Sequence, residues 1–134
     1  MAVVNKRTLV DSGTRHIVMF EINNDTNDAV QVVDASALTG HSSNPTLDIK
    51  SIKWNTTAAT SDLAFEFDAS TDSHGISVHG SGEYGFHGKQ PMLTNPEASG
   101  VTGDIVITNA AAVTGTFILE VKKTKGYTAS GQTR

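Results

Sequence analysis

The stretch GVTGDIVITNAAAVTGTFILEVKKTKGY, which runs from Gly100 to Tyr127, decides the fold class of this chain. It contains two apolar, β-branched runs, Ile105–Thr108 and Thr116–Val121, separated by a short connection rich in Ala, Thr and Gly. In the second run apolar and other side chains alternate with a period of two, which is typical of a strand with one buried face. The inward face holds Phe117, Leu119 and Val121. The two runs predict a β-hairpin near the end of the chain.

Short strands divided by turn residues are also predicted upstream, back to the start of the chain. Turn signals such as Asp11-Ser12-Gly13 and Gly80-Ser81-Gly82 recur at close to the spacing of about 8–12 residues that sandwiches and barrels show. The predicted strands are Lys6–Val10, His16–Asn23, Ala29–Asp34, Leu47–Asn55, Asp62–Asp68, Gly75–His79, Glu83–His87, Gly103–Thr108 and Thr116–Lys123. No sustained helical stripe is present, and Asp34–Leu38 has room for one turn at most. The sequence therefore predicts an all-β protein: a single-domain antiparallel β-sandwich, with a jelly roll as its finer form.

Alternation within the strands also predicts the core. The parity of the apolar positions slips at Lys50-Ser51, and a slip of one residue inside a strand indicates a β-bulge. Trp54 is expected to anchor the core rather than to form a platform for a sugar. The expected core residues are Val18, Phe20, Ile22, Val32, Leu47, Ile49, Ile52, Trp54, Leu63, Phe65, Phe67, Ile76, Val78, Ile105, Ile107, Phe117, Leu119 and Val121.

The bulk composition fits one folded domain, residues 1–134, which is long enough to bury a core without covalent staples. The chain has no cysteine, which excludes disulfides and thiol chemistry and leaves the redox compartment open. A net charge of −4 argues against nonspecific binding to nucleic acid or to an anionic membrane. No apolar run approaches the ~20 residues that span a bilayer, and no signal peptide is visible, so we expect synthesis in the cytoplasm.

Both ends of the chain are polar. We expect Met1–Lys6 to form an N-terminal arm and Lys125–Arg134 to form a C-terminal tail. Between the strands, Gly88–Thr102 is the longest segment without a strand pattern, and its two prolines exclude it from a central strand.

Residue types that bind metals or catalyse reactions are present, but without the required spacing. His74, His79 and His87 are the closest histidines, yet the ligand spacings of zinc sites are absent. The segment Gly40–Asn44 fails as a nucleophile elbow because its last residue is not glycine. We therefore expect no enzymatic activity, no cofactor and no metal.

A calcium loop is partly imitated by Asn23, Asp25 and Asn27, which lie at alternate positions. Asp28 occupies the position where such a loop requires glycine. Because Ala29–Val33 has a strand pattern, a polar hairpin turn is the better interpretation of this segment.

The order of segments resembles small virion-associated proteins of tailed bacteriophages, which are similar to capsid decoration, or cement, proteins in size and β-rich character. The segments that carry the resemblance are Arg15–Ile22, Val32–Leu38, Leu47–Trp54, Phe65–Asp72, Gly80–Phe86, Gly100–Thr108 and Gly115–Lys123. They span nearly the whole chain, but they are structural segments without a catalytic signature, so no functional residue is transferred.

The resemblance implies a virion protein that is made in the host cytoplasm and then binds and stabilises the capsid shell. Its partners would be the major capsid protein or other virion proteins, together with further copies of itself, for example as a trimer. Two alternatives stay open: a neck- or tail-associated virion protein, and a carbohydrate-binding sandwich that stacks sugars on Trp54, Tyr84 or Tyr127.

The charged end of the chain is the candidate interface. Its residues are Lys122, Lys123, Lys125, Tyr127 and Arg134. The lysines could contact an acidic partner, or they could be the charges with which an edge strand resists aggregation.

Overall fold

The computed structural model describes residues 3–57, 62–86, 89–97 and 99–127. The described strands are β1 (Val3–Asp11), β2 (Arg15–Val33), β3 (His41–Thr56), β4 (Leu63–Phe67), β5 (Ser73–Val78), β6 (Ser81–Tyr84) and β7 (Ile105–Tyr127). All their pairings are antiparallel, which confirms the all-β, antiparallel prediction. One turn of 3₁₀ helix, η1 (Ala35–Ala37), lies inside the segment expected to allow a single turn. Within the described ranges, no helix has the length and apolar character to cross a membrane.

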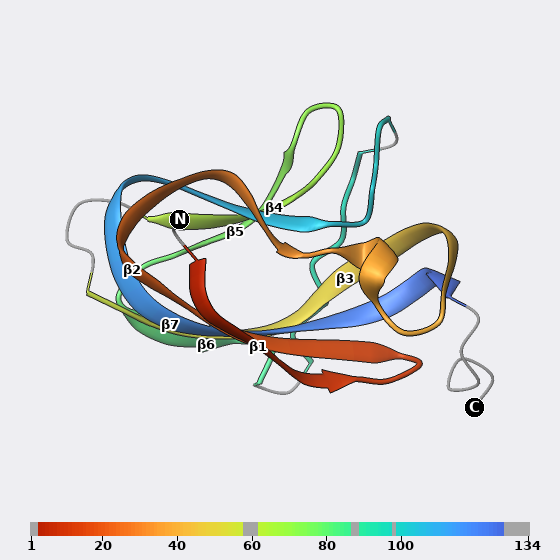
Figure 1. Ribbon diagram of the computed structural model, residues 1–134, viewed down its shortest axis with the longest axis horizontal. Helices are drawn as coiled ribbons and strands as arrows, with labels where there is room; N and C mark the ends of the chain where they lie inside the picture. The colour runs from red at the N-terminus through yellow and green to blue at the C-terminus, as the bar shows by residue number, and fades with distance from the viewer. Residues whose placement is uncertain (1–2, 58–61, 87–88, 98, 128–134) are drawn as a thin grey trace.

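One seven-stranded sheet folds over into two layers and does not close. The first half of β2 pairs with the second half of β7, and the second half of β2 pairs with the first half of β7. Both long strands therefore bend together and pass from one layer into the other (Figure 1). The first layer has the order β1-β2-β7-β3-β6, and the second continues from β2 and β7 to β4 and β5.

The predicted hairpin is wrong, because Ile105–Thr108 and Thr116–Val121 are the two halves of the single strand β7. The predicted strands His16–Asn23 and Ala29–Asp34 are likewise joined in β2. In each strand the segment between the two halves remains part of the sheet, because the segment of β2 pairs with that of β7. Several register shifts between them allow both strands to bend. Ala29, with φ of 51°, lies within this bend.

The polar hairpin turn predicted around Asn23–Asn27 is therefore also wrong, since this segment is the bend of β2. Buried Asn27 donates from Nδ2 to Oδ1 of buried Asn109 on β7, at 2.5 Å. Asn109 in turn donates to the carbonyls of Asp25 and Ala111. The Asn109 amide thus satisfies two backbone carbonyls where the ladder is irregular, which stabilises the bend.

The core lies between the layers, as the alternation predicts. Phe20 and Phe117 stack with ring centroids 5.2 Å apart, and Phe65 from the second layer meets Phe117 edge-on at 6.0 Å. Every expected core residue is buried except Trp54 and Ile76, which are half-buried against the core. Leu38, Val33, Val106 and Val113 are further core residues that the alternation did not identify.

The bulge predicted at Lys50-Ser51 is confirmed. Ile49 pairs with Val121 and Ser51 pairs with Glu120, so Lys50 is the extra residue on β3. The bulge restores an inward direction for Ile52, which is fully buried.

Candidate docking surface

The predicted interface residues are not on one surface. Lys122 and Lys125 are exposed, Lys123 and Tyr127 are buried, and Arg134 lies outside the described residues. The strand that carries the first four, β7, is central, because it pairs with β2 on one side and with β3 on the other. The interpretation of these lysines as edge-strand charges is therefore wrong.

Lys123 is the centre of a buried hydrogen-bond network. Its side chain is 0 % exposed, and its Nζ lies 2.6 Å from Asp11 Oδ1. The same Nζ donates to the carbonyl of Ser12 and, at 2.7 Å, to the carbonyl of Thr39. All three ammonium protons thus have acceptors, as a buried lysine requires. The network joins the β1–β2 turn, the segment before β3 and the end of β7.

Tyr127 is a core residue, only 5 % exposed, beneath the same network. Its hydroxyl donates to the carbonyl of Ala35 at 2.8 Å, and the Lys123 ammonium lies 5.1 Å from the centroid of its ring. Burial raises the pKa of the Tyr127 hydroxyl, with Asp11 as the next cause. Tyr127 is therefore covered by other described residues and presents no ring face to a partner or a sugar.

Asp11, which accepts a hydrogen bond from Lys123, lies beside His16, whose buried Nδ1 has no hydrogen-bond partner among the described residues. The pKa values of both side chains are lowered, for different reasons. Burial raises the pKa of Asp11, but hydrogen bonds from Lys123 and Thr39 outweigh it, and the pKa is lowered overall. Burial lowers the pKa of His16 despite Asp11, whose Oδ1 lies 3.9 Å from His16 Nδ1. Neutral His16 beside the Asp11–Lys123 pair is thus the form that the fold favours.

The sequence did contain the signal for Lys123. The alternation that directs Leu119 and Val121 inward continues without a break, so it also directs Lys123 inward. The neighbouring lysines suggested that this segment is exposed to solvent, so Lys123 was assigned to the surface although the alternation points it inward. Its partner Asp11 is 112 residues away in sequence, so the acceptor could not be found from spacing.

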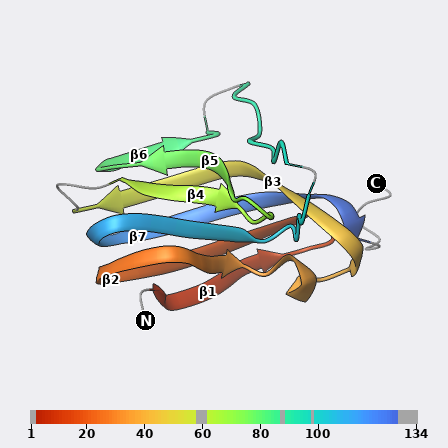
Figure 2. The same cartoon turned by 90° about the horizontal axis from the view of Figure 1, so that it is seen from above.

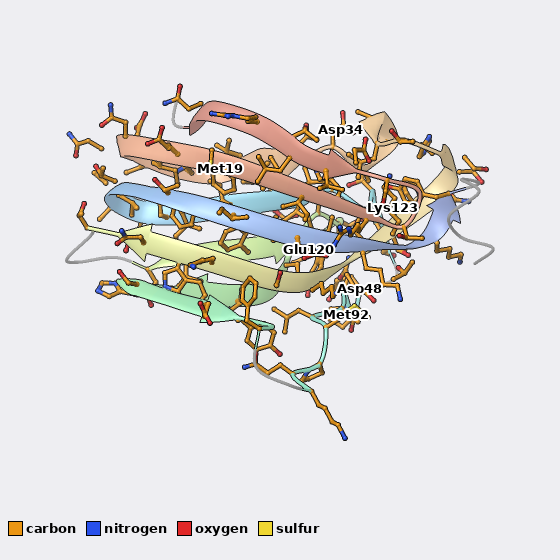
Figure 3. The ribbon with its side chains drawn as sticks, turned by 90° about the horizontal axis from the view of Figure 1, so that it is seen from below. Met19, Asp34, Asp48, Met92, Glu120 and Lys123 are labelled. Carbon is orange, nitrogen blue, oxygen red and sulfur yellow. The ribbon has the colours of Figure 1, made fainter. Side chains whose placement is uncertain are left out.

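The outer face of the first layer is defined by cross-strand rows of outward side chains. One row runs Arg7–Met19–Ile118–Lys53–Glu83 across all five strands. The next row runs Val10–Ile17–Glu120–Ser51. The four apolar members, Val10, Ile17, Met19 and Ile118, are half-buried although no described element covers them. Figure 3 shows this face, with Met19 and Glu120 labelled on it.

Cations surround Glu120 at one side of the outer face. Glu120 Oε2 lies 3.5 Å from Arg15 Nη1 and 3.7 Å from Lys50 Nζ. Lys122 and Met92 line the same shallow hollow of about 380 Å³. Asp48 pairs with Lys122 across β3 and β7 and adds a second carboxylate. The three cations therefore exceed the two carboxylates by one charge on this side of the face.

The second layer has the opposite charge. Eight of the nine described lysines and arginines lie on β1, β3, the first half of β2 or the second half of β7, and the ninth, Lys89, follows β6. The described residues of the second layer and its loops have none. Their acidic residues are Asp25, Asp28, Asp34, Asp62, Glu66, Asp68, Asp72 and Asp104. Burial, and then the neighbouring charges of Asp34 and Asp68, raise the pKa of Asp104, although the Ala35 N–H and Gln31 stabilise its carboxylate.

The remaining candidate residues have local partners. His79 Nδ1 lies 3.2 Å from Asp62 Oδ1, His74 Nε2 lies 3.1 Å from Ser77 Oγ, and His87 is outside the described residues. No group of three or more His, Cys, Asp or Glu side chains in the described part of the chain is arranged to hold a metal ion.

Two aromatic side chains considered for sugar stacking are half-buried and bonded at their polar ends. Trp54 donates from Nε1 to the carbonyl of His79 at 3.1 Å, and Tyr84 donates from its hydroxyl to the carbonyl of Pro91 at 2.7 Å. Trp54 also packs closely on Gly82, where a Cβ would lie 2.7 Å from the indole ring. These contacts favour a structural role for both side chains.

Comparison of the chain with models of protein families, with curated proteins and with solved structures found no match.

Proposed function

We propose that the protein is a structural component of a bacteriophage virion, a capsid decoration or cement protein that binds the assembled shell and stabilises it. The observation that carries this proposal is the outer face of the first layer. Its half-buried apolar centre of Val10, Ile17, Met19 and Ile118 lies among charged side chains. An apolar centre with a polar rim is the usual composition of a protein–protein interface.

The architecture supports a mechanical role. Two long strands, β2 and β7, are shared by both layers, so the layers are joined by continuous backbone as well as by the core. We propose that this folded-over sheet is a β-sandwich, with the jelly roll as its finer form. A rigid platform of this kind binds without losing much conformational entropy.

The partner in this proposal is the major capsid protein or another virion protein, and the location is the virion after synthesis in the host cytoplasm. Specific docking buries about 1,200–2,000 Å² in total, which a five-stranded face is wide enough to supply. Copies that join as a homo-oligomer, such as a trimer, bind a symmetric shell through several sites at once. The proposal includes no catalysis, no cofactor, no nucleic acid and no membrane.

The two alternatives are a neck- or tail-associated protein and a carbohydrate-binding sandwich. The former uses the same docking face at another position in the virion. Glycan binding has less support, because Tyr127 is buried. Trp54 and Tyr84 are half-buried, and their polar ends are hydrogen-bonded within the protein. The aromatic positions therefore support shell binding over glycan binding.

Binding to purified shells tests the proposal. Ile118→Lys places a charge at the apolar centre of the outer face, so co-sedimentation with shells should fall by about tenfold or more. Ala110→Lys is the matched control, because Ala110 is exposed on the same strand, in the bend and outside the two rows of the outer face. It should bind as the unmodified protein does.

Shells that carry the protein should also rupture at a higher temperature than bare shells in calorimetry. If the protein does not sediment with shells and bare shells are equally heat-resistant, the proposal is wrong. Sedimentation with tail or neck fractions alone would support the alternative of a neck- or tail-associated virion protein.

A further inference from the structure

Strand β5 forms one edge of the second layer. Among the described residues, β5 pairs with β4 alone, so the backbone groups on its other side lack a strand partner. Figure 2 shows β5 along the same open side of the molecule as β6. At this side the core residue Ile76 remains half-buried, whereas its cross-strand neighbour Phe65 is fully buried.

The other described edges carry features that oppose strand addition. Strand β1 has Lys6 and Arg7, two register shifts and a positive φ at Asn5. Strand β6 has only four residues. The second half of β2 has repeated register shifts and Ala29 at φ 51°. By contrast, β5 has six residues, SHGISV, with no Lys, Arg, Asp, Glu or Pro and one register shift.

The negative charge around the edge of β5 favours a positively charged partner. Strand β5 belongs to the second layer, whose described residues include no lysine or arginine. Glu66 is paired with His74 across the β4–β5 ladder, and Asp72 directly precedes β5. Two copies of this edge would repel each other, since each brings the same acidic layer. An extended segment with positive charge would be attracted.

We propose that the free edge of β5 binds an extended, basic peptide segment by β-strand addition. Main-chain hydrogen bonds to β5 supply the affinity, and the acidic layer supplies the preference for Lys and Arg side chains. The inference goes beyond the proposed function, because shell docking is assigned to the outer face of the first layer and this site lies in the second. The two can therefore fail separately.

Synthetic peptides test the site. The probe is a fluorescent eight-residue peptide of alternating Lys and Val, compared with a peptide of alternating Glu and Val, by fluorescence anisotropy at low salt. The Lys-Val peptide should bind at least about tenfold more tightly, and its binding should weaken near 1 M salt, where the Debye length is about 3 Å. A third peptide, the Lys-Val sequence methylated at alternate backbone nitrogens, cannot complete the ladder and should bind at least about tenfold more weakly.

Variants then locate the site. Ser77 is exposed and faces outward on β5, so Ser77→Lys should fold normally and weaken binding of the Lys-Val peptide by about tenfold. Thr116→Lys adds the same charge at an exposed position of the central strand β7 and should bind nearly as the unmodified protein does. Glu66→Gln removes the nearest paired carboxylate and should weaken binding by about two- to threefold without affecting the folded state.

Equal binding of the methylated and unmethylated peptides would overturn the proposal, because it would show attraction to acidic charge without strand addition. Tighter binding of the Glu-Val peptide would overturn it as well. So would equal loss in Ser77→Lys and Thr116→Lys, or no loss in Ser77→Lys.

Discussion

The interior between the layers has an aromatic centre and an ionic end, and both are buried. The aromatic centre is Phe20, Phe65 and Phe117. The ionic end is Asp11, His16, Lys123 and Tyr127, where all but half-buried Asp11 are at most 5 % exposed. The centre requires only that apolar side chains point inward. The ionic end requires each donor to meet an acceptor from a distant segment, so it fixes how the β1–β2 turn, η1 and β7 lie relative to one another.

Loss of the buried ammonium should have the largest effect. Lys123→Ala removes three hydrogen bonds and the partner of Asp11, so it should lower the free energy of unfolding by about 3–5 kcal/mol in urea denaturation. Lys122→Ala, one residue away and exposed, should change it by less than about 0.5 kcal/mol. Similar losses in both variants would show that the ionic end does not hold the segments together.

The aromatic centre should respond nearly as strongly. Phe117→Ala and Phe65→Ala each leave a large cavity in a close-packed region and should lower the free energy of unfolding by about 3–5 kcal/mol. Because the two rings are in contact, the double variant should cost less than the sum of the single variants. Losses under about 1 kcal/mol at both sites would contradict the core assignment.

The hydroxyl of Tyr127 should make a smaller contribution. Tyr127→Phe keeps the ring in the core but leaves the Ala35 carbonyl without this donor, so it should cost about 1–2 kcal/mol. Thermal unfolding of this variant beside Tyr84→Phe, whose hydroxyl bond is exposed, measures the difference. An equal effect at both positions would show that burial of the hydroxyl bond adds nothing.

The smallest effect should be a dependence on pH between about 7.5 and 5. The fold lowers the pKa of His16, so the unfolded chain takes up this proton more readily as the pH falls below about 6.5. Stability that is present above this pH should therefore decrease on acidification. Denaturant titrations at several pH values should show a flatter profile for His16→Gln than for the unmodified protein. If the pH dependence of stability is the same in His16→Gln as in the unmodified protein, another group is responsible for it.

The alternation of apolar side chains with a period of two was sufficient to predict the aromatic centre, most of the core around it and the bulge at Lys50. It was not sufficient to find the bends. Asn109–Gly115 has the small and polar residues of a turn, yet it stays in β7 because Asn109 and Val113 pair with β2. Turn propensity is local, whereas pairing along the whole strand depends on the partner.

The sequence by itself determined the all-β class, the inward faces of the strands and the absence of cysteine chemistry, because these follow from side-chain alternation and composition. Only the tertiary structure decided that one sheet folds over into two layers, that Lys123 and Tyr127 are buried, and that positive charge is confined largely to one layer. These features depend on which distant segments meet. A lysine in a strand is equally compatible with water and with three buried acceptors until the chain has folded.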